Sequence, residues 1–126
     1  MNIPKDLKYT KEHEWAKIEG KVATIGISDY AQKELGDIVF VELPPVGTAV
    51  ERDKEMTTIE SVKAASDIFA PVSGKIIEVN TGLDEQPELV NKEPYGRGWI
   101  VKIEMSNAEE AAGLMSAGNY EKLVGE

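Results

Sequence analysis

The sequence predicts a mostly-β domain of short strands, folded as a sandwich or a flattened barrel. Apolar and polar residues alternate along most of the chain, which is the pattern of strands with one buried face. Glycines and prolines separate the alternating stretches at short intervals, where turns are expected. Because no heptad repeat, low-complexity tract or linker interrupts the chain, the sequence predicts one domain over residues 1–126.

Seven stretches carry the strand pattern. It is clearest in Lys21–Ser28 and in Gly98–Met105, where every second residue is apolar. The other predicted strands are Glu14–Ile18, Asp37–Leu43, Met56–Val62, Asp67–Ala70 and Lys75–Asn80.

A short helix is expected between the predicted strands Lys21–Ser28 and Asp37–Leu43. Ser28 or Asp29 can cap its N-terminus, and Gly36 is suited to end it. Asp84–Gly98, which is rich in proline and glycine, is the longest predicted loop and is long enough to suggest a role beyond connection.

The C-terminal part of the chain is expected to be helical. Ser106 and Glu109 have the spacing of a capping box, so a helical segment is expected over about 107–124. We expect this segment to cover an open edge or face of the sheet rather than to bind a dedicated partner.

The composition leaves the chain little reactive chemistry of its own. It has no cysteine, which excludes disulfides, thiolate nucleophiles and cysteine-based metal or iron–sulfur sites. Its single histidine, His13, excludes a site built from several histidines, and we expect no metal site. A redox or acyl-transfer role would therefore need a reactive group brought in from outside.

Acidic residues dominate the charge. Fourteen basic against 23 acidic side chains give a net charge of −9, which disfavours nucleic acid and anionic membranes as partners. The chain has no apolar run of membrane-spanning length, and its first residues lack the features of a signal or transit peptide. We therefore expect a cytoplasmic protein.

One lysine stands at a distinctive place. Lys63 lies between two strand-like stretches, Thr57–Val62 and Asp67–Val72, and small residues follow it directly. This arrangement places Lys63 near the tip of a hairpin over about 56–72, exposed on a rigid support. A solvated lysine on a turn is the simplest interpretation of that spacing alone.

Four collinear segments extend the pattern well beyond the hairpin. They are YTKEHEW (9–15), VATIGISDYAQKELGDIVFVELPPVG (22–47), ESVKAASDIFAPVSGKIIEVN (60–80) and PELVNKEPYGRGWIVKIE (87–104). Together they resemble the glycine cleavage system H protein family over nearly the whole chain. The resemblance implies a flattened hybrid barrel-sandwich of the biotinyl and lipoyl carrier type, with lipoate attached to Lys63 through an amide bond.

The resemblance also implies a carrier rather than an enzyme. Its arm would collect the aminomethyl group of glycine from a pyridoxal-phosphate glycine decarboxylase and pass it to a tetrahydrofolate-dependent aminomethyltransferase. A dihydrolipoyl dehydrogenase would then reoxidise the dithiol, and a separate enzyme would attach the lipoate. A shuttle that visits several active sites is expected to be a monomer.

Further residues receive roles from the resemblance. The loaded arm is expected to fold back against the body, where Glu14 and Asp67 are candidates for pairing with its protonated amine, and Glu12 and His13 for lining the same cleft. Glu60 and Gly74 are candidates for recognition by the lipoate-attaching enzyme.

Alternatives remain on the sequence alone. Biotinyl domains usually flank their lysine with methionines, whereas Val62 and Ala64 stand here. Lipoyl domains of 2-oxoacid dehydrogenase complexes are shorter and usually carry Asp-Lys-Ala at the tip. A small hydrolase with paired carboxylates and an interaction module without a cofactor are alternatives from other functional classes.

Overall fold

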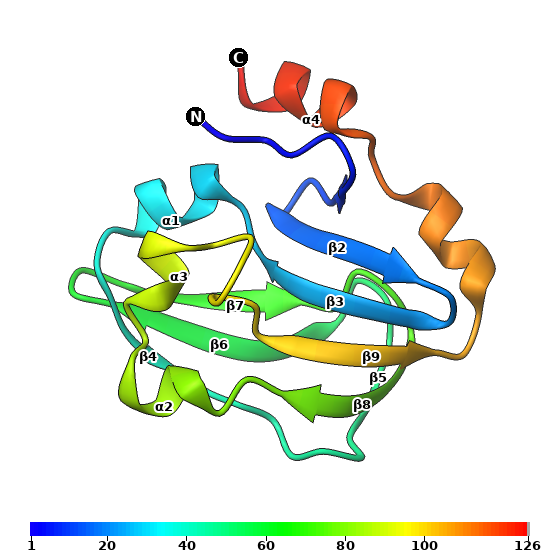
Figure 1. Cartoon of the computed structure of the whole chain (residues 1–126), viewed down its shortest axis with the longest axis horizontal. Helices are drawn as coiled ribbons and strands as arrows, with labels where there is room; N and C mark the ends of the chain where they lie inside the picture. Colours follow the sequence, from blue (N-terminus) through cyan, green and yellow to red (C-terminus); the bar gives the residue numbers. More distant parts are fainter. Residues whose placement is uncertain (126) are drawn as a thin grey trace.

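The structure, a computed structural model, describes residues 1–125 and consists of two antiparallel sheets that face each other (Figure 1). The larger sheet has the order β1-β2-β3-β9-β8-β5, and the smaller has the order β4-β6-β7. The strands of the larger sheet are Lys8–Tyr9 (β1), Glu14–Glu19 (β2), Val22–Ile27 (β3), Val101–Met105 (β9), Gly74–Val79 (β8) and Ala49–Val50 (β5). Those of the smaller sheet are Ile38–Val41 (β4), Glu55–Ser61 (β6) and Ala65–Phe69 (β7).

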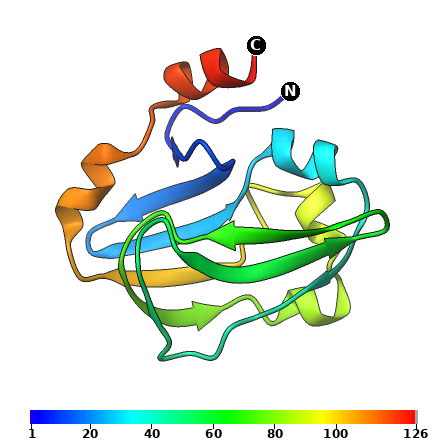
Figure 2. The ribbon, with the colours of Figure 1, turned by 180° about the vertical axis from the view of Figure 1, so that it is seen from behind.

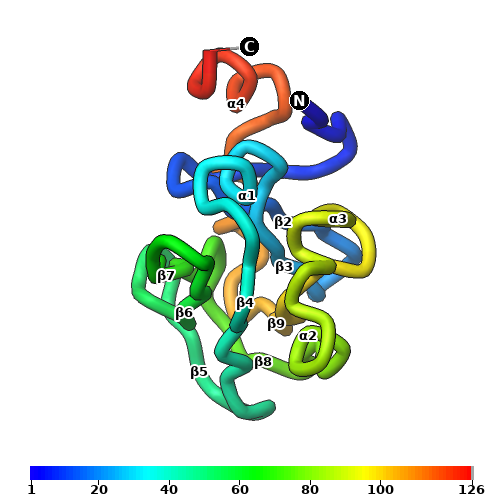
Figure 3. The backbone as a smooth tube through the Cα atoms, turned by 90° about the vertical axis from the view of Figure 1, so that its left-hand side faces the viewer, coloured from blue at the N-terminus to red at the C-terminus, as the bar shows by residue number. Residues whose placement is uncertain are grey.

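The main core lies between the two sheets, which the edge-on view separates (Figure 3). Ile59 and Ile68 of the smaller sheet pack with Ile25, Ile76 and Ile103 of the larger one, and each is at most 2% exposed. In β6 and β9 buried residues alternate with more exposed ones, so the period of two in these parts of the sequence reflects burial of one face. The predicted fold class, a mostly-β flattened barrel-sandwich, is confirmed.

The predicted strands are all present, with ends shifted by at most three residues. Two short strands, β1 and β5, were not predicted, because two paired residues leave no periodic signal. In β4 the regular alternation expected along Asp37–Leu43 is wrong: Ile38 and Val41 are buried, while Val39 and Phe40 between them are exposed. A bulge between Ile38 and Phe40 shifts the register and causes this difference.

The helix α1 (Asp29–Leu35) confirms the prediction of a short capped helix. Ser28 is its N-cap and accepts a hydrogen bond from the amide of Ala31 at 3.1 Å. Gly36 ends it with φ 81°, a conformation that glycine adopts without steric cost.

The predicted loop Asp84–Gly98 is wrong in part. The first helical turn, α2 (Gly82–Glu85), overlaps its start, and a second, α3 (Leu89–Lys92), lies within it. Leu89 and Val90 of α3 are buried, so the need to cover the core imposes helical turns on a segment rich in loop-forming residues.

The C-terminal segment is helical in two pieces. A 3₁₀ helix, η1 (Ala108–Gly113), precedes α4 (Ala117–Val124). The expected cap is wrong: Asn107, not Ser106, accepts the hydrogen bond from the amide of Glu109. Among the described residues, no helix has the length and apolar character needed to span a membrane.

The C-terminal segment covers the edge strand β1, as the sequence predicts. The main chains of Tyr9 and Met115 pair in both directions, at 2.9 and 2.8 Å. The N-terminal segment and α4 lie side by side at one end of the molecule in both ribbon views (Figure 2). This end holds a second core cluster of Leu7, Tyr9, Trp15, Ala117 and Tyr120.

Candidate functional site

Lys63 lies in the turn of the β6–β7 hairpin, at the place that the sequence predicts. The turn is closed by a hydrogen bond from the amide of Ser61 to the carbonyl of Ala64, at 2.8 Å. The Ser61 hydroxyl accepts from the amides of Lys63 and Ala64, at 3.3 and 3.1 Å, and donates to the Ala64 carbonyl at 3.1 Å. One buried hydroxyl therefore holds the main chain on both sides of the lysine.

The hairpin turn also contacts the connection between α1 and β4. The amide of Val62 donates to the carbonyl of Asp37 at 3.0 Å. A Cβ atom placed on Gly36 would lie 3.6 Å from Cε of Lys63, so the lysine side chain passes over this glycine. The Asn91 side chain in α3 accepts from the amide of Ile38 at 2.8 Å and donates to the carbonyl of Gly36 at 2.9 Å.

The Lys63 side chain is exposed, and no ion pair among the described residues involves it. Val62 beside it is exposed to 69%, and Phe40, which pairs with Glu60 of the same hairpin, is exposed to 49%. An accessible amine on a turn held by main-chain hydrogen bonds is chemically suited to acylation by another protein.

A cleft of about 310 Å³ lies between the β1–β2 turn and the start of β6 and end of β7. Its most buried acidic residue is Glu14, at 2% exposure. One carboxylate oxygen of Glu14 accepts from the Thr10 hydroxyl at 2.5 Å, and the other accepts from the amide of Phe69 at 3.2 Å. The residues lining the cleft are Thr10, Lys11, Glu12, Glu14, Asp53 and Phe69.

Burial changes the acidity of Glu14. Removal from water disfavours the charged carboxylate and raises the pKa of Glu14 to about 7, although the hydrogen bonds from Thr10 and Phe69 oppose this shift. The nearby Glu12 raises the pKa further. Glu14 is therefore a carboxyl group that gains or loses its proton near neutral pH and would respond to a cation placed beside it.

The four residues expected at the cleft have different positions. Glu12 and Glu14 line it, whereas Asp67 and His13 do not. Asp67 is exposed on β7, two residues before Phe69 on the same face, and accepts a long hydrogen bond of 3.4 Å from the Thr58 hydroxyl.

His13 is turned toward the second core cluster. Its Nδ1 lies 2.8 Å from the hydroxyl of Tyr120, and its ring packs on that of Tyr30 with 4.7 Å between centroids. The structure therefore places the His13 side chain against Tyr30 and Tyr120 and not among the residues that line the cleft. The backbone of His13 has a positive φ of 74°.

A family model described as Glycine cleavage H-protein matches residues 7–126. The chain belongs to the glycine cleavage H-protein family. It is a lipoyl carrier of the glycine cleavage system, in agreement with an exposed lysine on a hairpin and a neighbouring acidic cleft.

Individual relatives agree with this assignment. The glycine cleavage system H protein of Carboxydothermus hydrogenoformans is 56% identical over 124 residues, covering 98% of this chain and 95% of that protein. The corresponding protein of Halalkalibacterium halodurans is 53% identical over 125 residues, with 99% and 98% covered. The crystal structure of a glycine cleavage system H protein from Mycobacterium marinum superposes with a TM-score of 0.91 at 37% identity, covering 98% of this chain and 100% of that one.

The two residues expected to guide lipoate attachment to this glycine cleavage H-protein family member lie far apart in the fold. Glu60 is exposed in β6, three residues before Lys63, and pairs across the sheet with Phe40 and Ala65. Gly74 begins β8 in the other sheet, where a Cβ atom would lie 2.0 Å from the carbonyl oxygen of Glu104. The close approach of β8 to β9 therefore leaves no room for a side chain at Gly74.

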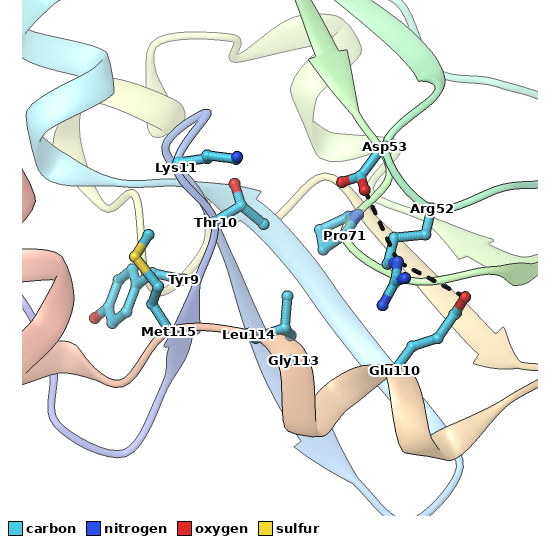
Figure 4. Close-up of a pocket in the computed structure, with 10 residues that line it drawn as sticks. All are labelled: Tyr9, Thr10, Lys11, Arg52, Asp53, Pro71, Glu110, Gly113, Leu114 and Met115. Atoms are coloured by element: carbon cyan, nitrogen blue, oxygen red, sulfur yellow. Dashed lines mark ion pairs between the residues drawn. The ribbon is translucent and has the colours of Figure 1, made fainter.

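The residues that complete the cleft could not be predicted from the sequence. Asp53 is in the turn before β6, with φ 68°, and faces the β1–β2 turn. A second cavity of about 230 Å³ adjoins the cleft and shares Thr10, Lys11 and Asp53 with it (Figure 4). On one side of this cavity Arg52 pairs with Asp53 and Glu110 at 3.8 and 3.9 Å (Figure 4).

In the part of the chain that the structure describes, no group of three or more histidine, aspartate or glutamate residues could hold a metal ion.

Proposed function

We propose that lipoate is attached to Nζ of Lys63 and that the chain carries the aminomethyl group of glycine between enzymes. The exposed lysine on a turn held by Ser61 is the observation that supports this proposal most strongly, together with membership of the glycine cleavage H-protein family. When bound, lipoate supplies two sulfur atoms that can carry the aminomethyl group and alternate between disulfide and dithiol.

The proposal names four partners. They are a pyridoxal-phosphate glycine decarboxylase, a tetrahydrofolate-dependent aminomethyltransferase, a dihydrolipoyl dehydrogenase and a lipoate-attaching enzyme. The chain acts in this scheme as a monomeric carrier and not as the catalyst of any step. The cytoplasmic location expected from the sequence is part of the same proposal.

The cleft beside β7 is the proposed shelter for the cargo. Asp67 and Phe69 follow Lys63 by four and six residues, roughly 13 and 20 Å along an extended strand. The lipoylated lysine side chain has about twelve bonds between Cα and sulfur and spans about 15 Å when extended, at about 1.25 Å per bond. The sulfur therefore reaches as far as Asp67, and the carried aminomethyl group extends roughly 2.5 Å further, toward the cleft that Phe69 lines together with Glu14 and Glu12.

Glu14 is proposed to pair with the protonated amine of the cargo. A cation beside a buried carboxyl group favours the ionised carboxylate, so we expect the pKa of Glu14, about 7 in the structure, to fall when the cargo enters. The same pairing keeps the amine protonated, and a protonated amine has no lone pair with which to expel the sulfur. Glu14 thereby protects the cargo from loss as formaldehyde and ammonia.

Reconstitution of glycine cleavage with purified partner enzymes tests the attachment site. Lys63→Arg keeps the charge but removes the amine that can be acylated, so carrier activity should disappear while the folded structure persists. Lys54→Arg, at another exposed turn before β6, is the matched control and should retain full activity. Normal activity of the Lys63→Arg protein would contradict the proposal.

The decay rate of the loaded carrier tests the shelter. In Glu14→Gln we expect the cargo to be lost about tenfold faster, since a charge-assisted hydrogen bond is worth about 1.5–3 kcal/mol. Glu60→Gln, which changes an exposed glutamate outside the cleft, should leave the decay rate unchanged. Equal decay rates for the Glu14 variant and the parent protein would remove Glu14 from this role.

Glu60 and Gly74 enter the proposal in different ways. Glu60 shares an exposed face with the hairpin tip and is proposed to orient the lipoate-attaching enzyme. Gly74 acts only through the close packing of β8 on β9, which keeps the sheet that supports the hairpin in place.

A further inference from the structure

The conformation of the β1–β2 turn is unusual. His13 has φ 74°, one of two positive values among the non-glycine residues that the structure describes. Such a conformation carries a steric cost of about 1–3 kcal/mol for a non-glycine residue, so other contacts must maintain it. Because His13 directly precedes Glu14, the turn determines where the carboxyl group of Glu14 lies.

Hydrogen bonds within the turn involve its main chain and the side chain of Thr10. The amide of His13 donates to the carbonyl of Thr10 at 3.1 Å, and the amide of Thr10 donates to the carbonyl of Glu14 at 3.0 Å. The amides of Glu12 and Glu14 donate to the hydroxyl of Thr10 at 3.3 and 3.2 Å. None of these bonds engages the side chain of His13. That side chain is held by a residue from the other end of the chain, Tyr120 in α4.

The hydroxyl of Tyr120 lies between two segments. It is 2.8 Å from Nδ1 of His13 and 2.6 Å from the hydroxyl of Ser28, the N-cap of α1. The amide of Ser28 in turn donates to the carbonyl of His13 at 2.9 Å. Side chain and main chain of His13 are therefore both tied to the start of α1, and Tyr120 completes the connection.

The groups that form these bonds are uncharged at neutral pH. Burial lowers the pKa of His13 and raises that of Tyr120 to about 12. A tyrosine hydroxyl both donates and accepts hydrogen bonds, so that of Tyr120 can bond to Nδ1 of His13 and to the hydroxyl of Ser28 at the same time.

The ring of Tyr120 is itself fixed. It is fully buried and stacks on the ring of Tyr9 with 4.6 Å between centroids and 5° between planes. The main chain of Tyr9 pairs with Met115 at the entrance to α4. The hydroxyl of Tyr120 thus approaches the turn from a rigid position, which is what a positioning group requires.

We infer that Tyr120 is a positioning residue for the arm cleft: through His13 it holds the β1–β2 turn in the conformation that sets the carboxyl group of Glu14 against Thr10 and Phe69. The inference rests on the proposed function of the cleft and adds to it a role for the C-terminal helix. No residue of α4 lines the cleft. The helix acts on the cleft only through this hydrogen-bonded chain.

The variant Tyr120→Phe tests this role, since it removes the hydroxyl and keeps the stacked ring. The pKa of Glu14, measured by NMR of its labelled carboxyl carbon during a pH titration, should fall by about one unit, because the turn loosens and water reaches the group. The other charged groups at this cleft, Lys11, Glu12 and Asp53, are unchanged in the variant. The loaded arm should lose its cargo about fivefold faster, the factor expected for one lost hydrogen bond.

Tyr95→Phe is the matched control. The hydroxyl of Tyr95 belongs to the same aromatic region but bonds to the main chain of Asp29 and Asn2, not to the turn. This variant should leave the titration of Glu14 and the decay of the loaded arm unchanged. If Tyr95→Phe shifts them as much as Tyr120→Phe does, the effect is general loosening and the inference is overturned.

His13→Asn supplies a second, independent variant. Asparagine tolerates a positive φ, so the backbone conformation is kept while the imidazole is removed. The pKa of Glu14 should fall by the same amount as in Tyr120→Phe. The double variant should show no larger fall, because both changes break the same connection. Additive shifts, or an unchanged Glu14 titration in Tyr120→Phe, would overturn the inference. An unchanged cargo lifetime in Glu14→Gln would instead contradict the proposed function and leave the titration test intact.

Discussion

At the tip of the β6–β7 hairpin, Lys63 is held by its immediate neighbours, Ser61 and Ala64, and its side chain is exposed. At the cleft, Glu14 is 2% exposed and is held by Thr10 and Phe69, the second of which is 55 residues away. The tip is thus a local structure that presents a group to other proteins. The cleft is a long-range structure that removes a carboxyl group from water, and this burial raises the pKa of Glu14 to about 7.

This difference suggests that the two regions respond differently to change. Loss of a contact at the tip should affect the attachment of lipoate and leave the rest of the fold intact. Loss of a contact at the cleft should affect folding stability and its dependence on pH, because the cleft joins β2 to β7 of the opposite sheet.

The largest effect is expected for the pH dependence of stability. The pKa of Glu14 is raised from 4.5 to about 7, so between these values the folded chain holds a proton that the unfolded chain has lost. The free energy of unfolding should therefore fall by about 3 kcal/mol as the pH rises through this window, at 1.36 kcal/mol per unit. In Glu14→Gln this part of the pH dependence should vanish.

Urea unfolding at a series of pH values measures this effect. Glu60→Gln, on the exposed face of β6, is the matched control and should keep the slope of the parent protein. A Glu14→Gln protein that loses stability between pH 4.5 and 7 as steeply as the parent would show that Glu14 does not titrate in this window.

A somewhat smaller effect is expected for Gly74→Ala. A Cβ atom at this position would lie 2.0 Å from the carbonyl oxygen of Glu104 and 2.9 Å from Cγ2 of Ile103, so β8 must move away from β9. Crowding of this kind costs about 1–3 kcal/mol, which thermal unfolding would detect. Gly118→Ala, where nothing lies within 4 Å, is the control and should not be destabilised.

Gly74→Ala also distinguishes a role of Gly74 in sheet packing from a direct contact with the lipoate-attaching enzyme. If it acts through the sheet, folded Gly74→Ala protein should accept lipoate at close to the parent rate. A protein of unchanged stability that is lipoylated slowly would instead place Gly74 in direct contact with the attaching enzyme.

The smallest effect on stability is expected at the hairpin tip. Ser61→Ala removes the hydroxyl that accepts from the amides of Lys63 and Ala64, at a cost of about 1 kcal/mol. The rate of lipoate attachment should fall a few-fold, because Lys63 is then held less firmly, while the pKa of Glu14 stays unchanged. Ser66→Ala, on the same hairpin, is the control for these measurements.

If Ser61→Ala changes the titration of Glu14, the tip and the cleft are coupled and the contrast between them is wrong. An unchanged rate of attachment would show that the attaching enzyme does not need the ordered turn.

The sequence allowed the local parts of the molecule to be predicted. The strand over Lys21–Ser28, the alternation in β9, the capped helix from Ser28 to Gly36 and the position of Lys63 between two strands all depend on neighbouring residues, and the structure confirms them. The expectation of one exposed face in β3 is wrong, because Thr24 and Gly26 are buried as well. The helical turns in Asp84–Gly98 and the bulge in β4 were missed, because there the packing of the core overrides the local pattern.

The cleft could not be predicted in this way either, because it forms from residues that are distant in the sequence. Glu14 was a candidate through the resemblance, but its burial depends on Phe69 from β7, and the inclusion of Asp53 depends on a turn near the middle of the chain. Asp67 was expected beside Glu14 and instead lies on the exposed face of β7. Tyr120 could not be found, because nothing in a C-terminal helix indicates a contact 107 residues away.

The most direct test of the central claim is mass spectrometry of the chain after incubation with lipoate, ATP and a lipoate-attaching enzyme, followed by peptide mapping. The account predicts one lipoyl group per chain, on Lys63, and none on the Lys63→Arg protein. A chain that stays unmodified, or that is modified on another exposed lysine such as Lys54 while Lys63 is free, would contradict it.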